Sequence, residues 1–152
     1  MANADEGGTF QKPSPLERAF GQVLMTLVKI GLMRGHFHVL EVRGRKSGRL
    51  FSVPVDPLTW EGRLYLVCPR GQSQWVRNAM VAGEITLVRA LRRRRYRVDD
   101  VPPHLRAPIL KAYLDAFAGE VQRFFPVPKG SPVERFNDLA PRYPVFQLTL
   151  LE

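Results

Sequence analysis

Short glycine-containing turns connect several β-type segments of this chain, and this spacing strongly limits how it can fold. Gly44 to Gly48 joins two such segments, and Glu61-Gly62 joins the second of them to a third. Connections of this length pair neighbouring strands antiparallel, because a parallel crossover needs a dozen or more residues. The expected strands are 37–43, 49–60, 64–68, 85–91, 94–101 and 144–151. They predict an α+β fold in which six antiparallel strands form a small barrel with helices packed outside.

Helix signals lie between and around these segments. Ser14-Pro15-Leu16-Glu17 is a capping box with proline at the first helical position, and it predicts a helix over residues 16–33. A short helix is expected over residues 74–82. A second long helix is expected to start at Pro102-Pro103, and Ser131-Pro132-Val133-Glu134 repeats the capping-box pattern before another short helix.

The length of 152 residues is that of one ordinary domain. No repeat or linker divides it, so residues 14–152 are expected to form a single domain behind a flexible tail at 1–13. The single cysteine, Cys68, cannot form an internal disulfide and is typical of a reducing compartment. The acidic, polar first residues do not resemble a signal peptide, and no apolar run is long enough to span a membrane. A cytoplasmic location is expected.

The distribution of charge is more informative than its total. The formal net charge is +9, and the excess lies within residues 34–97, while the segments on either side are close to neutral. Of the 23 basic residues, 18 are arginine, whose planar guanidinium grips phosphates and carboxylates in two places at once. A GC-rich genome explains part of the preference for arginine but not its clustering. The clustering predicts a polyanionic partner.

Metal and acyl-transfer chemistry are not expected. His36 and His38 would share one face of a strand, but His104 is the only other histidine, so a zinc ligand set is not apparent. The sequence contains no Gly-x-Ser-x-Gly nucleophile elbow and no evident pair of catalytic carboxylates. Cys68 lies in an apolar strand, which favours a packed thiol over a nucleophile.

The turn Gly44-Arg45-Lys46-Ser47-Gly48-Arg49 is the strongest local motif. Its two glycines free the backbone, and three cations and a hydroxyl occupy the rest of the turn. Backbone N–H groups in such a turn can form an anion nest, with the side chains as clamps. It is not a Walker A loop, because the order of glycines and lysine differs. A solvated basic turn would have the same composition.

A second motif spans Pro69 to Asn78. A buried-type strand ends in the polar loop Pro69-Arg70-Gly71 and runs into a helix N-terminus, where anions bind readily. Trp75 and Asn78 are three residues apart and share a helix face. An aromatic plane beside an amide can hold a planar heterocyclic ligand, although an isolated tryptophan more often belongs to a core.

Two further segments suggest other partners. Arg92-Arg93-Arg94-Arg95 is expected between two strands, where alternation would divide the four side chains between opposite faces, so it is a weak nucleic-acid site. The helix at 16–33 is apolar and has a single charge, Lys29, between Ala19 and Met33. It could contact a membrane surface, although packing against the barrel is the favoured interpretation.

Taken together, these motifs and the closing Tyr143-Pro144-Val145-Phe146-Gln147-Leu148 resemble one family. They are similar, from about residue 20 to 151, to the deazaflavin-dependent nitroreductases of the flavin/deazaflavin oxidoreductase superfamily. The resemblance implies a split β-barrel and the cofactor 8-hydroxy-5-deazaflavin, coenzyme F-420, whose tail carries a phosphodiester and several glutamates. It implies hydride transfer from the reduced cofactor to an electron-poor small molecule, such as a quinone, a nitroaromatic or an activated enone.

The same resemblance assigns site residues. Arg45, Lys46 and Ser47 correspond to binders of the anionic tail, Arg70 and Gly71 lie near the phosphate and ring, and Trp75 and Asn78 border the pocket. The full expected cofactor set is Arg45, Lys46, Ser47, Gly48, Arg49, Pro54, Cys68, Pro69, Arg70, Gly71, Trp75 and Asn78.

The sequence also departs from the family. Phe51 stands where relatives often carry a tail-binding arginine, and Arg49 is the nearest cation that could replace it. Tyr113 and Tyr143 are the only candidates for substrate-facing tyrosines. Two alternatives stay open: the same barrel binding FMN or another ligand, and a non-catalytic basic module that binds nucleic acid or an anionic membrane. The oligomeric state is not predicted.

Overall fold

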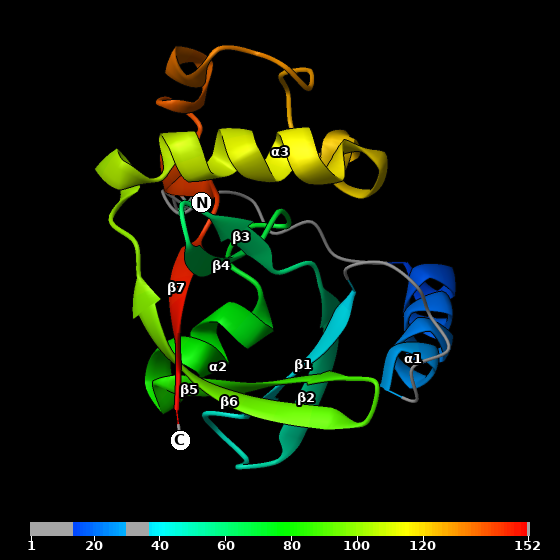
Figure 1. The fold of residues 1–152 in the computed structure, drawn as a ribbon. Coiled ribbons are helices and arrows are strands. Elements are labelled where there is room, and N and C mark those ends of the chain that lie inside the picture. The colour runs from blue at the N-terminus through cyan, green and yellow to red at the C-terminus, as the bar shows by residue number, and fades with distance from the viewer. Residues whose placement is uncertain (1–13, 30–36, 152) are drawn as a thin grey trace, which may run out of the picture.

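A computed structural model describes residues 14–29 and 37–151, and its centre is one curled sheet of antiparallel strands (Figure 1). The strands are β1 (His38–Arg43), β2 (Leu50–Val55), β3 (Leu58–Trp60), β4 (Arg63–Val67), β5 (Glu84–Arg89), β6 (Arg92–Asp100) and β7 (Val145–Leu150). Their order across the sheet is β2-β1-β5-β6-β7-β4-β3. The α+β class and the antiparallel pairing are confirmed, but the sheet has seven strands rather than six.

The additional strand arises because the expected segment 49–60 turns a corner. Asp56-Pro57 separates β2 from β3, and proline cannot donate a hydrogen bond to a strand ladder. β2 then pairs with β1 at one edge of the sheet, and β3 pairs with β4 at the opposite edge. One apolar stretch of sequence therefore supplies both edges.

The two halves of the sheet curl around α2 (Gln74–Ala82). Leu40 of β1, Val55 of β2 and Leu66 of β4 belong to one buried cluster together with Val76 of α2. Because strands from both halves of the sheet contribute to it, this cluster lies on the concave face. α2 thus fills the inside of the curl, which corrects the expectation that every helix packs outside.

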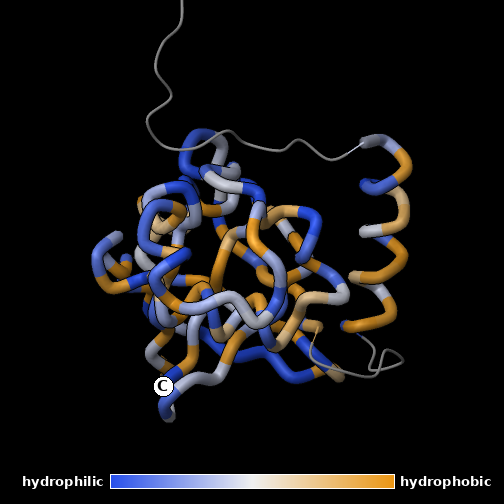
Figure 2. Tube along the Cα trace, turned by 90° about the horizontal axis from the view of Figure 1, so that it is seen from above, coloured by the Kyte–Doolittle hydropathy of each residue, from blue (hydrophilic) through white to orange (hydrophobic). Residues whose placement is uncertain are grey.

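α1 (Pro15–Lys29) lies against the outer face of the half of the sheet formed by β2, β1 and β5. Its contact residue Val28 is buried with Val39 of β1 and Val88 of β5. Seen from above, α1 stands at the side of the molecule and carries hydrophobic residues along its length (Figure 2).

The capping box at the start of α1 is confirmed. The Ser14 N–H donates to Glu17 Oε2 at 2.8 Å, and the Glu17 N–H donates to Ser14 Oγ at 3.1 Å. Each side chain therefore satisfies a backbone donor that the first helical turn leaves without a partner. Residues 30–33 of the expected helix, and the expected tail at 1–13, lie outside the described residues.

α3 (Ala107–Val121) covers the outer face at the other end of the sheet. Its fully buried Leu110 and Leu114 share a core cluster with Tyr65 and Val67 of β4. Short 3-10 helices precede and follow it, at Pro103–Leu105, Gln122–Phe124, Val133–Phe136 and Ala140–Arg142. The second expected capping box thus leads into a single 3-10 turn, which has no side-chain cap.

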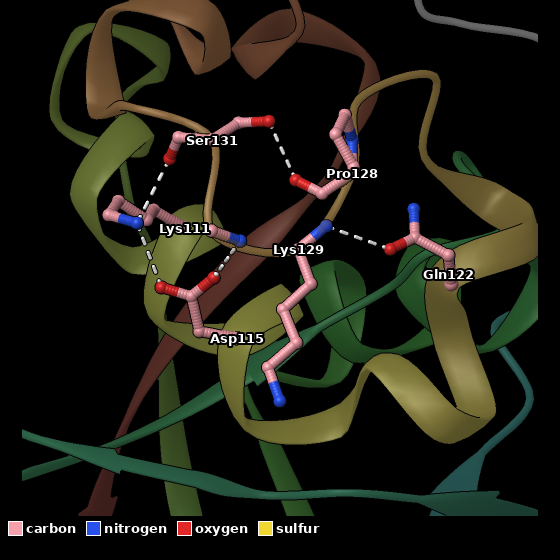
Figure 3. Close-up of polar contacts among 7 residues, drawn as sticks. Lys111, Asp115, Gln122, Pro128, Lys129 and Ser131 are labelled. Atoms are coloured by element: carbon pink, nitrogen blue, oxygen red, sulfur yellow. Dashed lines mark hydrogen bonds and ion pairs between the residues drawn. The ribbon is translucent and has the colours of Figure 1, made fainter.

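Polar contacts hold the loop after α3 against the helix (Figure 3). Lys111 Nζ donates to Asp115 Oδ2 and to the Ser131 carbonyl, each at 2.9 Å. The other Asp115 oxygen accepts from the Gly130 N–H at 2.8 Å, and Gln122 Nε2 donates to a loop carbonyl at 2.8 Å. The charged groups of α3 that face the loop, Lys111 and Asp115, are paired within this network, so we assign it a structural role.

The arginine run lies within a strand and not between two strands. All four arginines belong to β6, and the turn before it is Ala90-Leu91, where both residues have positive φ angles of 49° and 64°. The expected alternation is confirmed: Arg93 and Arg95 make ion pairs with Glu41 and Glu84, whereas Arg94 lies opposite Leu87 on the other face.

Within residues 14–29 and 37–151, none of the helices combines the length and the apolar character that crossing a bilayer requires.

Asp56, at the corner between β2 and β3, gives the fold a pH dependence. The residue is only 9% exposed, and burial, followed by the nearby Glu120 carboxylate, raises its pKa to about 7. A raised pKa means that the folded protein holds a proton which the unfolded chain releases near pH 4. Folding stability should therefore be fully present below pH 4, decline as the pH rises to about 7, and then level off.

We expect Asp56→Asn to remove this decline. At pH 8 the variant should be more stable to urea than the parent by a few kcal/mol, since one pKa unit is worth about 1.4 kcal/mol. At pH 4 the two proteins should be nearly equal. Asp138→Asn, at an exposed aspartate, is the matched control and should follow the parent at both pH values. A parent curve that is flat between pH 4 and 7 would contradict the assignment.

Candidate functional site

The two sequence motifs meet through one arginine and one asparagine. Asn78 Oδ1, on the buried side of α2, accepts from the backbone N–H of Arg45 at 3.1 Å and from its Nη1 at 2.8 Å. Gln74 Oε1 accepts from the same Nη1 at 3.0 Å. The Arg45 guanidinium is therefore occupied in clamping the turn 44–49 to α2, and we assign it and Asn78 to positioning the turn.

The turn itself is held by its own backbone. Gly44 N donates to the Arg49 carbonyl at 2.8 Å, and Gly48 N donates to the Gly44 carbonyl at 2.9 Å. The Arg49 N–H donates to Ser47 Oγ at 3.2 Å, and Gly48 has a φ of 70°, which favours glycine. Because these amides are engaged, the expected nest of N–H groups is not formed by them. The turn instead offers the exposed side chains of Lys46 and Arg49.

The loop between β4 and α2 is built around a buried serine. Ser73 is the N-cap of α2; its Oγ accepts from the Val76 N–H at 3.4 Å and from the Cys68 thiol at 3.3 Å. Burial raises the pKa of the Cys68 thiol, so it stays protonated at neutral pH. Gly71 has a φ of 88°, and its N–H donates to the Cys68 carbonyl at 3.2 Å. Cys68 and Gly71 therefore shape this loop.

The aromatic residues of the expected site lie in the two main core clusters. Trp75 is buried on the concave face, 5.9 Å from the Phe146 ring. Tyr113 lies on the buried side of α3, where burial raises its pKa well above the ordinary value. Tyr143 is stacked on Phe125 at 4.5 Å and donates a hydrogen bond to the Phe124 carbonyl. Pro54 and Pro69 are half-buried, in β2 and at the start of the β4–α2 loop.

A groove of about 520 Å³ lies between α1 and β2. It is lined by Gln22, Met25, Thr26 and Lys29 from the helix and, on the other side, by Arg49 at the end of the turn and Leu50, Phe51 and Ser52 of β2. Two of these residues are cations, and Phe51 supplies an aromatic ring that is half exposed. Small-molecule sites have volumes of about 300–1,000 Å³, so the groove has the size of a ligand site.

A buried carboxylate fixes the helix side of the groove. Glu41 of β1 is 5% exposed on the outer face of the sheet, where it makes ion pairs with Lys29 of α1, at 3.2 Å, and with Arg93 of β6. Charges taken out of water are stable only when they are paired. Glu41 therefore links the C-terminal end of α1 to the sheet and holds Lys29 beside the groove.

The N-terminal end of α1 is held by a second ionic cluster. Glu17 contacts Arg123 Nη1 at 2.6 Å and Arg70 Nη2 at 3.8 Å. The hydrogen bond from Arg123 is the largest cause that lowers the pKa of Glu17 to about 2. Both guanidinium groups also lie over the Phe124 ring, at 4.8 Å for Arg70 and 4.6 Å for Arg123. Arg70 is thus placed at the same helix as Arg49, near its opposite end.

The structure therefore divides the expected residues into three groups. Arg49 lines the groove, and Arg70 lies by the N-terminal end of the helix that forms one groove wall. Arg45 and Asn78 hold the turn in place. Cys68, Gly71, Trp75 and the two tyrosines belong to the loop framework or to the core.

The helix side of the groove was missed from sequence, because α1 is remote in sequence from the basic segment. One signal was available: Glu41 is the only acid between residues 34 and 55, and it lies between the apolar Leu40 and Val42. A lone carboxylate in such a strand needs a cation from elsewhere. Among the described residues, no cluster of metal-ligating side chains is found.

Comparison with solved structures identifies proteins of the same fold. A reductase dependent on reduced coenzyme F-420 superposes with a TM-score of 0.51 and 15% identity, over 75% of this chain and 94% of that one. A NimC/NimA family protein from Clostridium acetobutylicum gives 0.52 and 12%, over 75% and 73%. An FAD-binding protein from Mesorhizobium loti gives 0.51 and 11%, over 86% and 89%.

At these identities the likeness establishes the fold: the chain is a split barrel, as the sequence resemblance predicts. No protein-family model matches the chain, and no curated protein matches it in sequence.

The clamp between Arg45 and Asn78 can be tested by removing its acceptor. We expect Asn78→Ala to cost about 1–3 kcal/mol of stability, because it removes two hydrogen bonds at a buried site. Peptides covering residues 44–49 should also exchange backbone hydrogen faster, since the turn loses its anchor on α2. Asn78→Asp keeps an acceptor oxygen and should retain slow exchange. If Asn78→Ala left exchange in the turn unchanged, the clamp would not position it.

Proposed function

We propose that this protein is an oxidoreductase that binds coenzyme F-420 in the groove between α1 and β2. One observation carries the proposal: a single groove is lined by the basic segment at residues 49–52 and by α1, which contributes Lys29. The split-barrel fold is shared with a reductase that depends on this coenzyme and with an FAD-binding protein, which supports a flavin-like ligand. Cytoplasmic location remains part of the proposal.

The groove would hold the anionic end of a long ligand that continues along α1 beyond the lining residues. Lys29 and Arg49 lie at the C-terminal half of α1, and Arg70 lies by Glu17 at the N-terminal end. Glu17 and Lys29 are about 18 Å apart along the helix, at a rise of 1.5 Å per residue. A ligand with a ring and a phosphodiester tail is long enough to use both ends.

Individual residues take distinct roles in this proposal. Arg49 would hold the anionic tail, and the exposed Lys46 adds charge at the same turn. Lys29 lines the groove beside Arg49, but its charge is paired with Glu41. The ring of Phe51 packs against Gly44, where a Cβ would come within 2.5 Å of it. Phe51 therefore gives the groove an apolar wall at the position where members of the resembled family often carry an arginine.

The protein itself would bind, orient and exclude water. The bound reduced coenzyme supplies a hydride, that is two electrons and one proton, for an electron-poor acceptor such as a quinone, a nitroaromatic or an activated enone. Tyr113 and Tyr143 are buried away from the groove lining, so the proposal gives neither a catalytic role. Rate enhancement then comes from holding acceptor and coenzyme in contact.

A flavin such as FMN is the second candidate, because the fold is shared with an FAD-binding protein from Mesorhizobium loti. A phosphate on a short ribityl chain could use Arg49 without reaching Arg70. The two candidates therefore differ in how far they would extend along α1. Titrating the protein with each ligand distinguishes them, as set out below.

Nucleic acid is a weaker candidate. Three of the arginines in β6, Arg93, Arg95 and Arg97, make ion pairs with carboxylates. Sequence-independent binding of DNA depends on cations that can replace released counterions, and paired arginines are less available for this.

The proposal predicts that Arg49 contributes to coenzyme affinity. In a titration followed by quenching of deazaflavin fluorescence, the parent should bind in the micromolar range. Arg49→Ala should weaken binding about tenfold, which corresponds to about 1.4 kcal/mol for one lost charge-assisted contact. Raising the salt concentration should reduce the difference in coenzyme affinity between the parent and Arg49→Ala.

Arg135→Ala is the matched control, because it removes an exposed arginine from a 3-10 helix that packs against α3 and is absent from the groove lining. It should bind like the parent. A parallel titration with FMN separates the two ligands. The proposed site would be rejected if the parent showed no binding below millimolar F-420. It would also be rejected if Arg49→Ala and Arg135→Ala lost the same amount of affinity.

A further inference from the structure

α1 carries an apolar stripe that no described residue covers. Leu16, Phe20 and Val23 recur at positions i, i+4 and i+7 and so share one face of the helix. Their side chains are 80%, 69% and 60% exposed. Large apolar side chains that are grouped on one face, rather than scattered, mark an interaction surface.

The stripe is separate from the face by which α1 joins the barrel. That face is formed by Leu24, Met25 and Val28, which pack around Val39 and Val88. The helix therefore has a wide apolar arc, and only part of it is used in folding. In Figure 2 hydrophobic residues recur along α1, which stands at the edge of the molecule.

The neighbouring β5–β6 turn extends the stripe. The Ala90 and Leu91 N–H groups donate to the Val28 and Lys29 carbonyls, at 3.1 and 2.8 Å. This places the turn at the C-terminal end of α1. Leu91 is 77% exposed there and adds a further apolar side chain to the same edge of the protein.

The charges around this edge are almost all positive. Within residues 15–29 and 89–93 the cations are Arg18, Lys29, Arg89, Arg92 and Arg93, and the only acid is Glu17. Lys29 and Arg93 are paired with Glu41 of β1, which leaves Arg18, Arg89 and Arg92 with no ion pair among the described residues. Glu17 is itself paired with Arg123. A partner of this edge must therefore combine an apolar interior with a negatively charged surface.

We propose that α1 and the turn at Ala90-Leu91 dock on an anionic phospholipid surface. The apolar stripe would enter the boundary between headgroups and acyl chains, and the exposed Arg92 beside Leu91 would contact a lipid phosphate. The described part of the helix is 15 residues long, and an amphipathic element of this kind can lie in the plane of the interface. Charge argues against a second copy of the chain as the occupant, because two such edges would bring their cations together.

The proposal is tested with the full chain and vesicles in a sedimentation assay. Vesicles of phosphatidylcholine and phosphatidylglycerol should bind the parent, whereas vesicles of phosphatidylcholine alone should bind it weakly. Replacing the stripe by Leu16→Gln, Phe20→Gln and Val23→Gln together should reduce partitioning at least tenfold. Replacing Arg92 by Gln should reduce it about fivefold, as expected for one basic residue near the surface.

The matched control replaces three exposed apolar residues elsewhere, by Met80→Gln, Val81→Gln and Leu150→Gln, and should bind vesicles like the parent. Circular dichroism of each variant shows whether it is folded. Absence of binding to anionic vesicles, or equal losses in the stripe and control variants, would overturn the proposal. So would a dimer in light scattering that only the stripe variant dissociates. None of these readouts depends on the coenzyme.

Discussion

The placement of α1 depends on one buried carboxylate. Glu41 occupies the middle of a strand whose neighbours are apolar, and it makes ion pairs with Lys29 from α1 and Arg93 from β6. Without these cations the charge could not be buried, and without the carboxylate the two cations would repel each other. The pairing holds the C-terminal end of the helix to the outer face of the sheet, and the groove against β2 follows from that position.

The basic excess of the sequence is thereby divided into structural and available charge. Arg45 is occupied by Asn78, Arg93 by Glu41, and Arg123 by Glu17. Arg49 remains at the groove with no ion pair among the described residues. Counting cations in the sequence locates the segment expected to bind a polyanion. The contacts in the structure then identify which cations of that segment are still available to bind it.

Sequence patterns predicted the antiparallel class and the capping box of α1, because these depend on turn lengths and local hydrogen bonds. The split barrel was implied by the family resemblance. The patterns did not predict that Asp56-Pro57 divides one apolar stretch between the two edges of the sheet, since that corner depends on how the sheet curls. The burial of Trp75 and the groove beside Phe51 depend on packing between segments far apart in sequence. Such packing leaves little trace in local spacing.

The central claim is that the coenzyme occupies the groove between α1 and β2. Hydrogen exchange of the full chain, with and without saturating coenzyme F-420, tests it most directly. β2 is an edge strand, so its outward amides exchange readily unless a ligand covers them. The account predicts slower exchange in residues 22–29 and 49–52 when the coenzyme is bound. Protection confined to α3, at 107–121, with both groove segments unchanged, would contradict it.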